Sequence, residues 1–462
     1  MAKTIGSERP DFATKVGLVL ATAGSAVGLG NIWRFPVTTG NNGGAAFILI
    51  YVACVLVLGL PLMVAEFSVG RHAHTNTAQA YKQLSSHWLW SRVGQFGVFT
   101  GWFIMCYYTV VSGWALGYLV DSLCNRFGIL GGDIPDYKNH FSRFVANPYL
   151  PVLYTCALVL ISHFIIVRGV KRGIERVSKV LMPLLFIILL ILAVSSLFTP
   201  GAREGLTFLF RPDFTKITFQ TVLDAMGQAF YSLSLAMGCV CTYASYFSKD
   251  THLIGTAFKV GLIDSFVAVM AGIIIFPAVF STNIQPDEGA SLVFIALPGV
   301  FQQAFGLVPA LGYLVSVLFY FLLVIATLTS VISLHEVPTA YLAENYRLPR
   351  PKATAVVTAV CLLVATFCSL SMGPLDRFRI AGRNLFDLFD FVSGQIMLPL
   401  GGFLIALFVG WILDRRILRN QLTNGATVAP HTSRYVIILL RYFVPFAILL
   451  IFLSGMGIFH IV

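Results

Sequence analysis

Long apolar runs recur along the whole chain and decide the class of protein. A bilayer core requires about 20 consecutive apolar residues in a helix, and the sequence offers eleven runs of about that length or longer. They are Val16–Trp33, Phe35–Ala65, Val93–Val120, Phe144–Val167, Val180–Ala202, Ala225–Ser248, Ser265–Pro286, Gly289–His335, Ala353–Leu375, Phe391–Leu413 and Tyr442–Val462. We therefore predict an all-α polytopic membrane protein with eleven transmembrane helices.

The predicted segments divide into two successive sets of five and one extra helix. The first repeat covers residues 10–202, the second covers 219–413, and the extra helix lies at about 435–462, all in one transmembrane domain. One run of the second set, Gly289–His335, is too long for a single span. It contains prolines and a glycine that predict a re-entrant or surface hairpin before a helix at Leu311–Ala340. These are Pro298, Gly306 and Pro309.

Composition agrees with a membrane protein and gives an orientation. Only 11% of the residues are charged and 57% are hydrophobic, which excludes a water-soluble globule. The net charge of +11 comes from Lys and Arg in short loops such as 168–179 and 415–419. We assign this charge to the positive-inside rule, with the N-terminus cytoplasmic and the C-terminus external, and not to nucleic-acid binding. The first run follows Lys3, Arg9 and Lys15 as in a secretory signal peptide, but its polar interruptions favour a retained helix.

Two of the predicted helices are interrupted at matching places in the two sets. Residues 24–31 contain three glycines, a serine and an asparagine, and residues 232–238 contain two serines and a glycine. Paired interruptions of this kind indicate an inverted-repeat transporter, in which unwound backbone binds cations and a charged substrate near the middle of the bilayer. The alternative is close packing of helices at glycines.

Ionisable residues inside the apolar runs mark further candidates, because such groups are costly in a membrane. The acids are Glu66, Asp264, Glu336 and Asp390, and the deep cation is Arg34, about one helical turn after Asn31. We expect Asp390 to close over Arg34 as an external gate, with a purely structural ion pair as the alternative.

The eighth segment places Ala326, Ser330 and Leu334 on one helix face, with Thr329 beside them. Hydroxyl and carbonyl oxygens suit a hard cation, although Ser and Thr in membrane helices often bond back to their own backbone.

The sequence of the first interruption resembles a known family. Residues Gly24–Pro36 read GSAVGLGNIWRFP and are followed by Asn42-Gly43-Gly44, Pro61 and Glu66. Together with shorter motifs at 107–108, 232–234, 242–246, 328–330 and 390–391, they resemble the neurotransmitter:sodium symporters. The resemblance covers nearly the whole chain. It is strongest to the bacterial eleven-helix branch with the leucine-transporter fold, which includes transporters of several hydrophobic amino acids.

The resemblance implies two sodium sites made of oxygen ligands, and no organic cofactor. The first would use Ala26, Asn31, Ser232 and Asp264, completed by the carboxylate of the substrate. The second would use the carbonyl groups of Gly24, Val27 and Ala326 and the hydroxyls of Thr329 and Ser330. Asp264 stands where chloride-dependent relatives carry Asn, so we expect chloride independence.

The resemblance also implies an L-amino-acid substrate. The amide groups of Leu29 and Gly30 and the phenol of Tyr108 would hold its carboxylate, and carbonyl groups of segments 1 and 6, including Ala26, would hold its ammonium group. Gly28 stands where monoamine transporters carry an acid. The side chain of the substrate would lie among mostly apolar residues, which suit hydrophobic or aromatic amino acids. The predicted pocket residues are Ile104, Tyr108, Tyr231, Ser232, Ser234, Met237, Ser330 and Leu334.

The resemblance also implies a gate on each side of the membrane. The external gate would comprise Arg34, Asp390, Tyr108 and Tyr231, and the cytoplasmic gate Arg9, Tyr246 and Glu344. Phe12 stands where relatives often carry Trp near the cytoplasmic gate.

Gly173 and Pro183 flank nine residues at the start of segment 5. Both weaken helical hydrogen bonding, so this end is predicted to unwind and admit water to the second sodium site. Ordinary punctuation of a helix boundary is the alternative.

These expectations describe a sodium-driven amino-acid symporter of a bacterial cytoplasmic membrane that performs no covalent chemistry. A sodium-permeable channel or an amino-acid sensor with the same fold is the second hypothesis. An intramembrane enzyme is the third, but His163 and His335 lie without a neighbouring set of catalytic or metal-binding residues in the sequence.

Overall fold

The computed structural model describes residues 11–130, 134–281, 292–304, 309–424 and 430–458. Within these residues the chain is a helical bundle without a β-sheet, which confirms the predicted all-α class. Nine helices in this described part of the chain are long and apolar enough to cross a membrane. They are Ala45–Ala73, Trp88–Leu123, Leu150–Val167, Val170–Ser196, Leu253–Phe280, Ala310–Asn345, Arg350–Leu370, Leu385–Ile412 and Ser433–Gly455.

The two remaining predicted spans are the interrupted ones. With the first of them the described residues give up to ten spans, so the count of eleven stays a prediction. The first consists of Lys15–Ala26 and Gly30–Asn41, which are bent by 53° and together form one broken span. The sixth consists of α12 (Phe219–Ser232) and α13 (Cys239–Ala244), separated by six residues without helix. Neither piece of the sixth segment is long enough to span a bilayer by itself. The predicted breaks in segments 1 and 6 are confirmed.

Several helices extend beyond the predicted apolar runs or begin elsewhere. The run Phe35–Ala65 was predicted as one span, but α2 (Phe35–Asn41) continues the first segment through Arg34, and the second span begins at Ala45. Gly43 and Gly44 separate them with φ angles of 82° and 71°, which favour glycine. Arg34 does not mark a boundary, because a cation with an exposed side chain can lie within a helix.

The fifth and eighth helices also extend beyond their predicted bounds. The fifth helix begins at Val170, ten residues before the predicted Val180, because the basic residues of this region lie on the helix itself. The predicted helix Leu311–Ala340 is α16 (Pro309–Asn345), which continues through Pro338. The described part of the predicted hairpin before it is helical, with a π-helical turn at Leu292–Ala296 followed by α15 (Leu297–Ala304). Gly306 lies outside the described residues.

The bounds of the helices are as follows. In the first half they are α1 (Lys15–Ala26), α2 (Phe35–Asn41), α3 (Ala45–Cys54), α4 (Leu60–Ala73), α5 (Thr77–Leu84), α6 (Trp88–Leu123), α7 (Arg126–Leu130), α8 (Ile134–Ala146), α9 (Leu150–Val167), α10 (Arg176–Ser196) and α11 (Ala202–Phe210). In the second half they are α12 (Phe219–Ser232), α13 (Cys239–Ala244), α14 (Leu253–Phe280), α15 (Leu297–Ala304), α16 (Pro309–Asn345), α17 (Arg350–Leu370), α18 (Leu385–Phe391), α19 (Leu398–Leu407), α20 (Arg415–Thr423), α21 (Pro430–Ile438) and α22 (Val444–Gly455).

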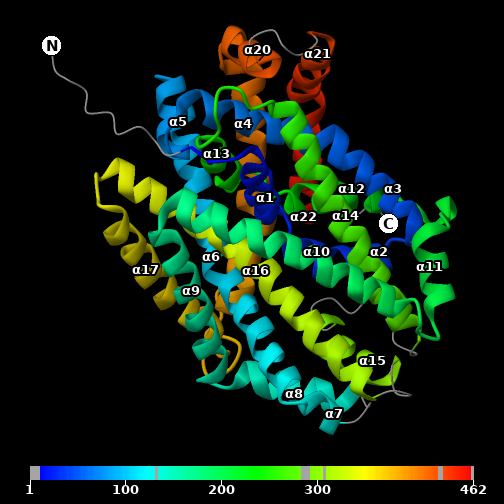
Figure 1. The fold of residues 1–462 in the computed structure, drawn as a ribbon. Helices are drawn as coiled ribbons and strands as arrows, with labels where there is room; N and C mark the ends of the chain where they lie inside the picture. Colours follow the sequence, from blue (N-terminus) through cyan, green and yellow to red (C-terminus); the bar gives the residue numbers. More distant parts are fainter. Residues whose placement is uncertain (1–10, 131–133, 282–291, 305–308, 425–429, 459–462) are drawn as a thin grey trace.

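The broken helices lie inside the bundle. Figure 1 shows α1 near the middle of the molecule, and α1 packs against α10, α14 and α16. The most extensive helix pairing joins α6 to α16, and α4 packs along α13. The interruptions are therefore enclosed by continuous helices, which keeps their free backbone groups away from lipid.

Close packing at Gly70 fixes the second half of segment 6 against α4. A Cβ atom at Gly70 would lie 2.1 Å from the carbonyl oxygen of Cys241 and 2.9 Å from the Cβ of Ala244. Because the first of these is a backbone atom, the neighbour cannot move aside cheaply.

We predict that Gly70→Ala lowers the free energy of unfolding by about 1–3 kcal/mol, measured as a lower melting temperature of the protein in detergent. Gly227→Ala is the matched control, because a Cβ atom at Gly227 meets nothing within 4 Å. Equal melting temperatures for the two variants would show that the contact between α4 and α13 is not tight.

Candidate functional site

The break in segment 1 frees backbone groups that other side chains bind. Helix α1 ends at Ala26, and Val27 has an extended backbone with a ψ of 112°. The amide of Gly28 donates to the Asn31 side-chain oxygen at 3.0 Å, and the amide of Leu29 donates to the Tyr108 phenol oxygen at 3.2 Å. Asn31 and Tyr108 therefore stabilise the break.

The break in segment 6 has an unusual backbone. Ser234, Ala236 and Gly238 have φ angles of 53°, 63° and 76°, and two of them are not glycine. Left-handed conformations of this kind cost free energy and need support from neighbouring groups. The amide of Ala236 donates to the Glu66 carboxylate at 2.7 Å, which gives this intramembrane acid a structural role.

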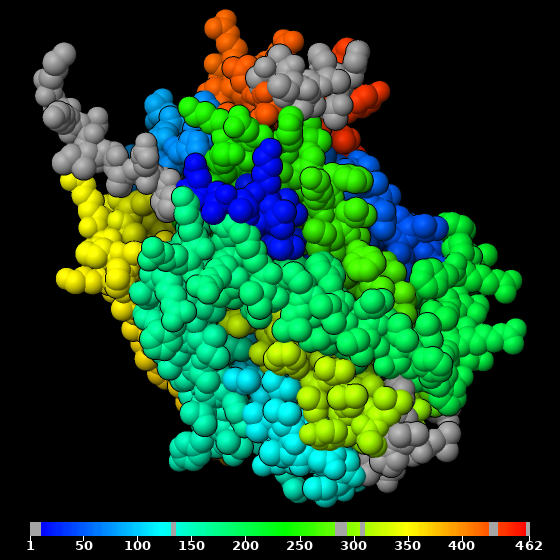
Figure 2. Space-filling model, in the orientation of Figure 1, coloured from blue at the N-terminus to red at the C-terminus, as the bar shows by residue number. Residues whose placement is uncertain are grey.

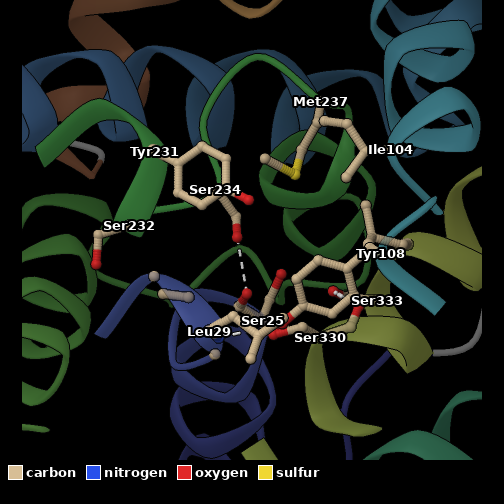
Figure 3. Close-up of a pocket in the computed structure, with 14 residues that line it drawn as sticks. Ser25, Leu29, Ile104, Tyr108, Tyr231, Ser232, Ser234, Met237, Ser330 and Ser333 are labelled. Atoms are coloured by element: carbon tan, nitrogen blue, oxygen red, sulfur yellow. Dashed lines mark hydrogen bonds between the residues drawn. The ribbon is translucent and has the colours of Figure 1, made fainter. Parts of the chain in front are cut away.

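The two breaks are also bonded to each other. The hydroxyl of Ser234 donates to the backbone oxygen of Ser25 at 2.7 Å, as Figure 3 shows. The side-chain amide of Gln228 donates to the carbonyl oxygen of Gly30 at 2.8 Å. The interrupted segments therefore form one hydrogen-bonded unit.

The residues predicted for the first sodium site lie together and are fully or almost fully buried. The Asn31 side-chain nitrogen donates to Asp264 Oδ1 at 2.8 Å, to the Asp264 carbonyl at 3.0 Å and to Ser232 Oγ at 3.1 Å. The Ser232 hydroxyl lies 2.9 Å and 3.0 Å from the two carboxylate oxygens of Asp264. Ala26 lines the adjoining cavity. The cluster is rich in oxygen, as a hard cation prefers.

Two polar residues of this cluster were missed in the sequence. Tyr51 donates its phenol hydrogen to Asp264 Oδ2 at 2.8 Å, and Gln228 contacts Gly30 as described. Both have no exposed surface. A buried Gln inside an apolar run is a signal of the same kind as the intramembrane acids, whereas a Tyr in such a run is too common to be informative.

The residues predicted for the second sodium site also meet between α1 and α16. The Ser330 hydroxyl lies 3.2 Å from the Val27 carbonyl oxygen, and the Thr329 hydroxyl lies 3.0 Å from that of Ala326. Gly24 faces the same helix, since a Cβ atom there would lie 3.4 Å from the Cβ of Thr329. Thr329 bonds back to its own helix, as the alternative interpretation expected. The Ser330 hydroxyl bonds instead to segment 1 at 3.2 Å and lies 3.4 Å from the Ala326 carbonyl oxygen of its own helix.

All eleven residues predicted for substrate binding line one cavity of about 30 Å³ between the breaks (Figure 3). Three lining residues were missed, namely Ser25, Gly28 and Ser333. The complete lining is Ser25, Ala26, Gly28, Leu29, Gly30, Ile104, Tyr108, Tyr231, Ser232, Ser234, Met237, Ser330, Ser333 and Leu334. Ser333 is i+3 from Ser330 and shares its helix face, so this signal was present in the sequence.

Gly28 leaves no room for a side chain. A Cβ atom there would lie 2.6 Å from Ser330 Oγ and 2.8 Å from the Tyr108 phenol oxygen. A side chain at this position would therefore have to displace both hydroxyls.

A larger cavity of about 310 Å³ lies next to the first and shares Leu29, Tyr108 and Tyr231 with it. Arg34 and Asp390 both line it, but no ion pair within 4 Å joins their side chains in the described part of the chain. The guanidinium of Arg34 instead lies over the Tyr231 ring, 4.6 Å from its centroid. The expected gate residues are thus neighbours, and the direct contact between Asp390 and Arg34 is not formed in this structure.

The predicted cytoplasmic gate is only partly described. Tyr246 donates its phenol hydrogen to Glu336 at 2.6 Å, and Arg350 forms an ion pair with Glu336 at 2.5 Å. Glu344 accepts from the backbone amide of Asn76 at 2.7 Å. Arg9 lies outside the described residues. Arg350 was missed because it is 14 residues from its partner in sequence.

Phe12 packs beside the network of Tyr246, Glu336 and Arg350. Its amide donates to the Tyr246 carbonyl at 3.1 Å, and its ring contacts Tyr243 edge-on at a centroid distance of 6.0 Å. It therefore covers the network with an aromatic ring.

The start of segment 5 is helical in this structure. Gly173 lies in a π-helical turn at Val170–Glu175, and Pro183 lies inside α10. Glu175 is 1% exposed and accepts from the Ala13 amide at 2.7 Å and the Thr14 hydroxyl at 2.9 Å. It also pairs with Lys179 at 2.6 Å. Glu175 thus ties segment 5 to the chain just before α1, although it was not among the predicted residues.

Comparisons with known proteins agree with this geometry. The sequence pattern of the sodium:neurotransmitter symporter family matches residues 9–129 and 149–460. An uncharacterised sodium-dependent transporter of Bacillus subtilis, YhdH, is 37% identical over 97% of this chain and 98% of its own. An uncharacterised sodium-dependent transporter of Haemophilus influenzae is 34% identical over 98% and 99%.

A solved structure is also similar. The crystal structure of MhsT in complex with L-phenylalanine superposes with a TM-score of 0.86 at 39% identity, covering 97% of this chain and 100% of that one. The fold, the broken helices and the sequence match over nearly the whole length lead to one conclusion. This chain belongs to the sodium:neurotransmitter symporter family, whose members are multi-pass membrane transporters.

Proposed function

We propose that the protein is a symporter that uses sodium to import hydrophobic or aromatic L-amino acids by alternating access. The observation that carries this proposal is the position of the cavity between two oxygen-rich clusters at the helix breaks. MhsT, a similar protein, was crystallised with L-phenylalanine. The site would lie in a bacterial cytoplasmic membrane, with the N-terminus inside and the C-terminus outside.

The first sodium ion would bind among Ala26, Asn31, Ser232 and Asp264, with the substrate carboxylate as the last ligand. The Asn31 amide nitrogen now faces three of these oxygens. Rotation of that amide would present its oxygen in place of its nitrogen to the ion, and it would break the hydrogen bond that the Asn31 oxygen accepts from the Gly28 amide. The second ion would bind among Gly24, Val27, Ala326, Thr329 and Ser330. A shared carboxylate ligand would couple the binding of the ion to that of the substrate.

The gates would control access to this site from each side. Arg34 and Asp390 would close the external cavity together with Tyr108 and Tyr231, and Arg9, Tyr246 and Glu344 would close the cytoplasmic side. Each inward positive charge gains about 2.3 kcal/mol per 100 mV of membrane potential. Substrate and sodium must bind differently in the outward-open and inward-open states, because equal affinity shifts no equilibrium.

We predict that proteoliposomes with an inward sodium gradient accumulate L-phenylalanine or another hydrophobic amino acid above equilibrium. Replacement of external sodium by choline should lower uptake at least tenfold, since the substrate carboxylate then lacks its cation. Radiolabelled uptake measures both. Sodium currents without amino-acid accumulation would instead support a channel, and sodium-dependent binding without transport would support a sensor.

A second prediction concerns chloride. The carboxylate of Asp264 supplies fixed negative charge beside the first sodium site, so wild-type uptake at constant sodium should not change when gluconate replaces chloride. Asp264→Asn removes this charge and should make uptake depend on chloride. Asp224→Asn is the matched control, because Asp224 is an acid on α12 that binds Asn42 and Gln220 instead. Chloride-dependent uptake by the wild-type protein would contradict the assignment.

The link between Glu175 and the chain before α1 leads to a third prediction. Glu175→Ala removes one ion pair and two hydrogen bonds, so residues 170–183 should unwind more often. We expect hydrogen exchange of these amides to rise about tenfold, measured by mass spectrometry, and Pro183→Ala should lower it. Glu204→Ala on the surface helix α11 is the control. Unchanged exchange in both test variants would show that segment 5 stays helical during transport.

A further inference from the structure

The hydroxyl of Ser25 is a buried polar group. It belongs to neither proposed sodium site, and it forms no hydrogen bond with a described backbone group. Ser25 is 3% exposed and lines the cavity between the breaks. Its Oγ atom lies within reach of the Cys239 thiol and has no hydrogen-bond partner among the nitrogen and oxygen atoms of the described residues. Its backbone oxygen, in contrast, accepts from Ser234. A buried hydroxyl without a partner costs free energy, so a group of this kind in a cavity wall points to a ligand that satisfies it.

Ser333 adds a second hydroxyl to the same wall. It is 1% exposed, lines the cavity, and donates to the carbonyl oxygen of Ser330 at 2.8 Å. Because its hydrogen is committed to Ser330, its oxygen can still accept a hydrogen bond but not donate one. The thiol of Cys239 lies beside Ser25 and Ser333, but a thiol is a weak hydrogen-bonding group.

The rest of the wall is apolar and adaptable. Ile104, Met237 and Leu334 line the same cavity, and Figure 3 shows Met237 and Ile104 across the cavity from Ser25 and Ser333. Met has three rotatable bonds in its side chain and can adjust to a ring of variable size. The wall therefore combines apolar surface for an aromatic ring with two hydroxyls that differ in their hydrogen-bonding capacity.

We infer that Ser25 and Ser333 form a specificity subsite for an L-amino acid with a phenolic side chain, in preference to an aromatic analogue of similar size that lacks the hydroxyl. This inference rests on the proposed function. A phenol can donate its hydrogen to Ser333 and accept the free hydrogen of Ser25, so it satisfies both groups. A site with buried polar groups rejects an analogue that leaves them unpaired.

The test compares L-tyrosine with 4-methyl-L-phenylalanine, which has nearly the same size but no hydroxyl. We expect the purified wild-type protein in saturating sodium to bind tyrosine about tenfold more tightly in competition with radiolabelled phenylalanine. In Ser25→Ala and in Ser333→Ala the ratio of the two affinities should fall toward one. Ser122→Ala is the matched control, because Ser122 is a buried serine that bonds to the Tyr118 carbonyl on α6 and does not line the cavity.

Each outcome decides the inference. A preference for tyrosine that both variants abolish and Ser122→Ala retains supports the subsite. Equal affinities in the wild-type protein, or an unchanged ratio in both variants, overturn it while sodium-dependent phenylalanine binding still upholds the proposed function. If neither variant folds, the wild-type ratio alone decides. No sodium-dependent binding of any of the three amino acids would overturn the proposed function itself.

Discussion

The constraint on which the rest of the structure depends is that polar backbone groups inside a membrane must find partners within the protein. Two helices of this chain are interrupted in the middle of the bundle, and each interruption releases amide and carbonyl groups. The groups are bound by side chains from other helices, such as Tyr108 at the first break and Glu66 at the second. In the proposed function, the backbone groups at the breaks that no protein group bonds are the ones that bind the ions and the substrate.

This constraint explains why the candidate sites adjoin one another. Asn31 supports the first break with its side-chain oxygen and contacts Asp264 and Ser232 with its nitrogen. Ser330 contacts the carbonyl of Val27 and also lines the cavity. Short-range hydrogen bonds thus connect the residues of both proposed ion sites to the breaks and to the wall of the cavity.

The two ends of the pathway differ in this structure. On one side, Glu336 is paired with Arg350 and bonded to Tyr246, and Phe12 covers this network. On the other side, Arg34 and Asp390 line an open cavity without a direct ion pair. Figure 2 shows the start of α1 at the surface of the molecule beside α10, where Glu175 joins them.

The sequence by itself determined the class of protein, the two breaks and most of the residues around the cavity. Apolar length, glycine spacing and intramembrane charge are local properties, and a helix turns neighbouring positions into a shared face. The tertiary structure decided the partners, because Tyr51 and Asp264, or Glu336 and Arg350, meet only after separate helices have packed. It also decided the helix ends, since Arg34 lies within a helix and has an exposed side chain. The surroundings of the Ser25 hydroxyl likewise depend on which groups from other helices pack around it, and a linear pattern does not contain that information.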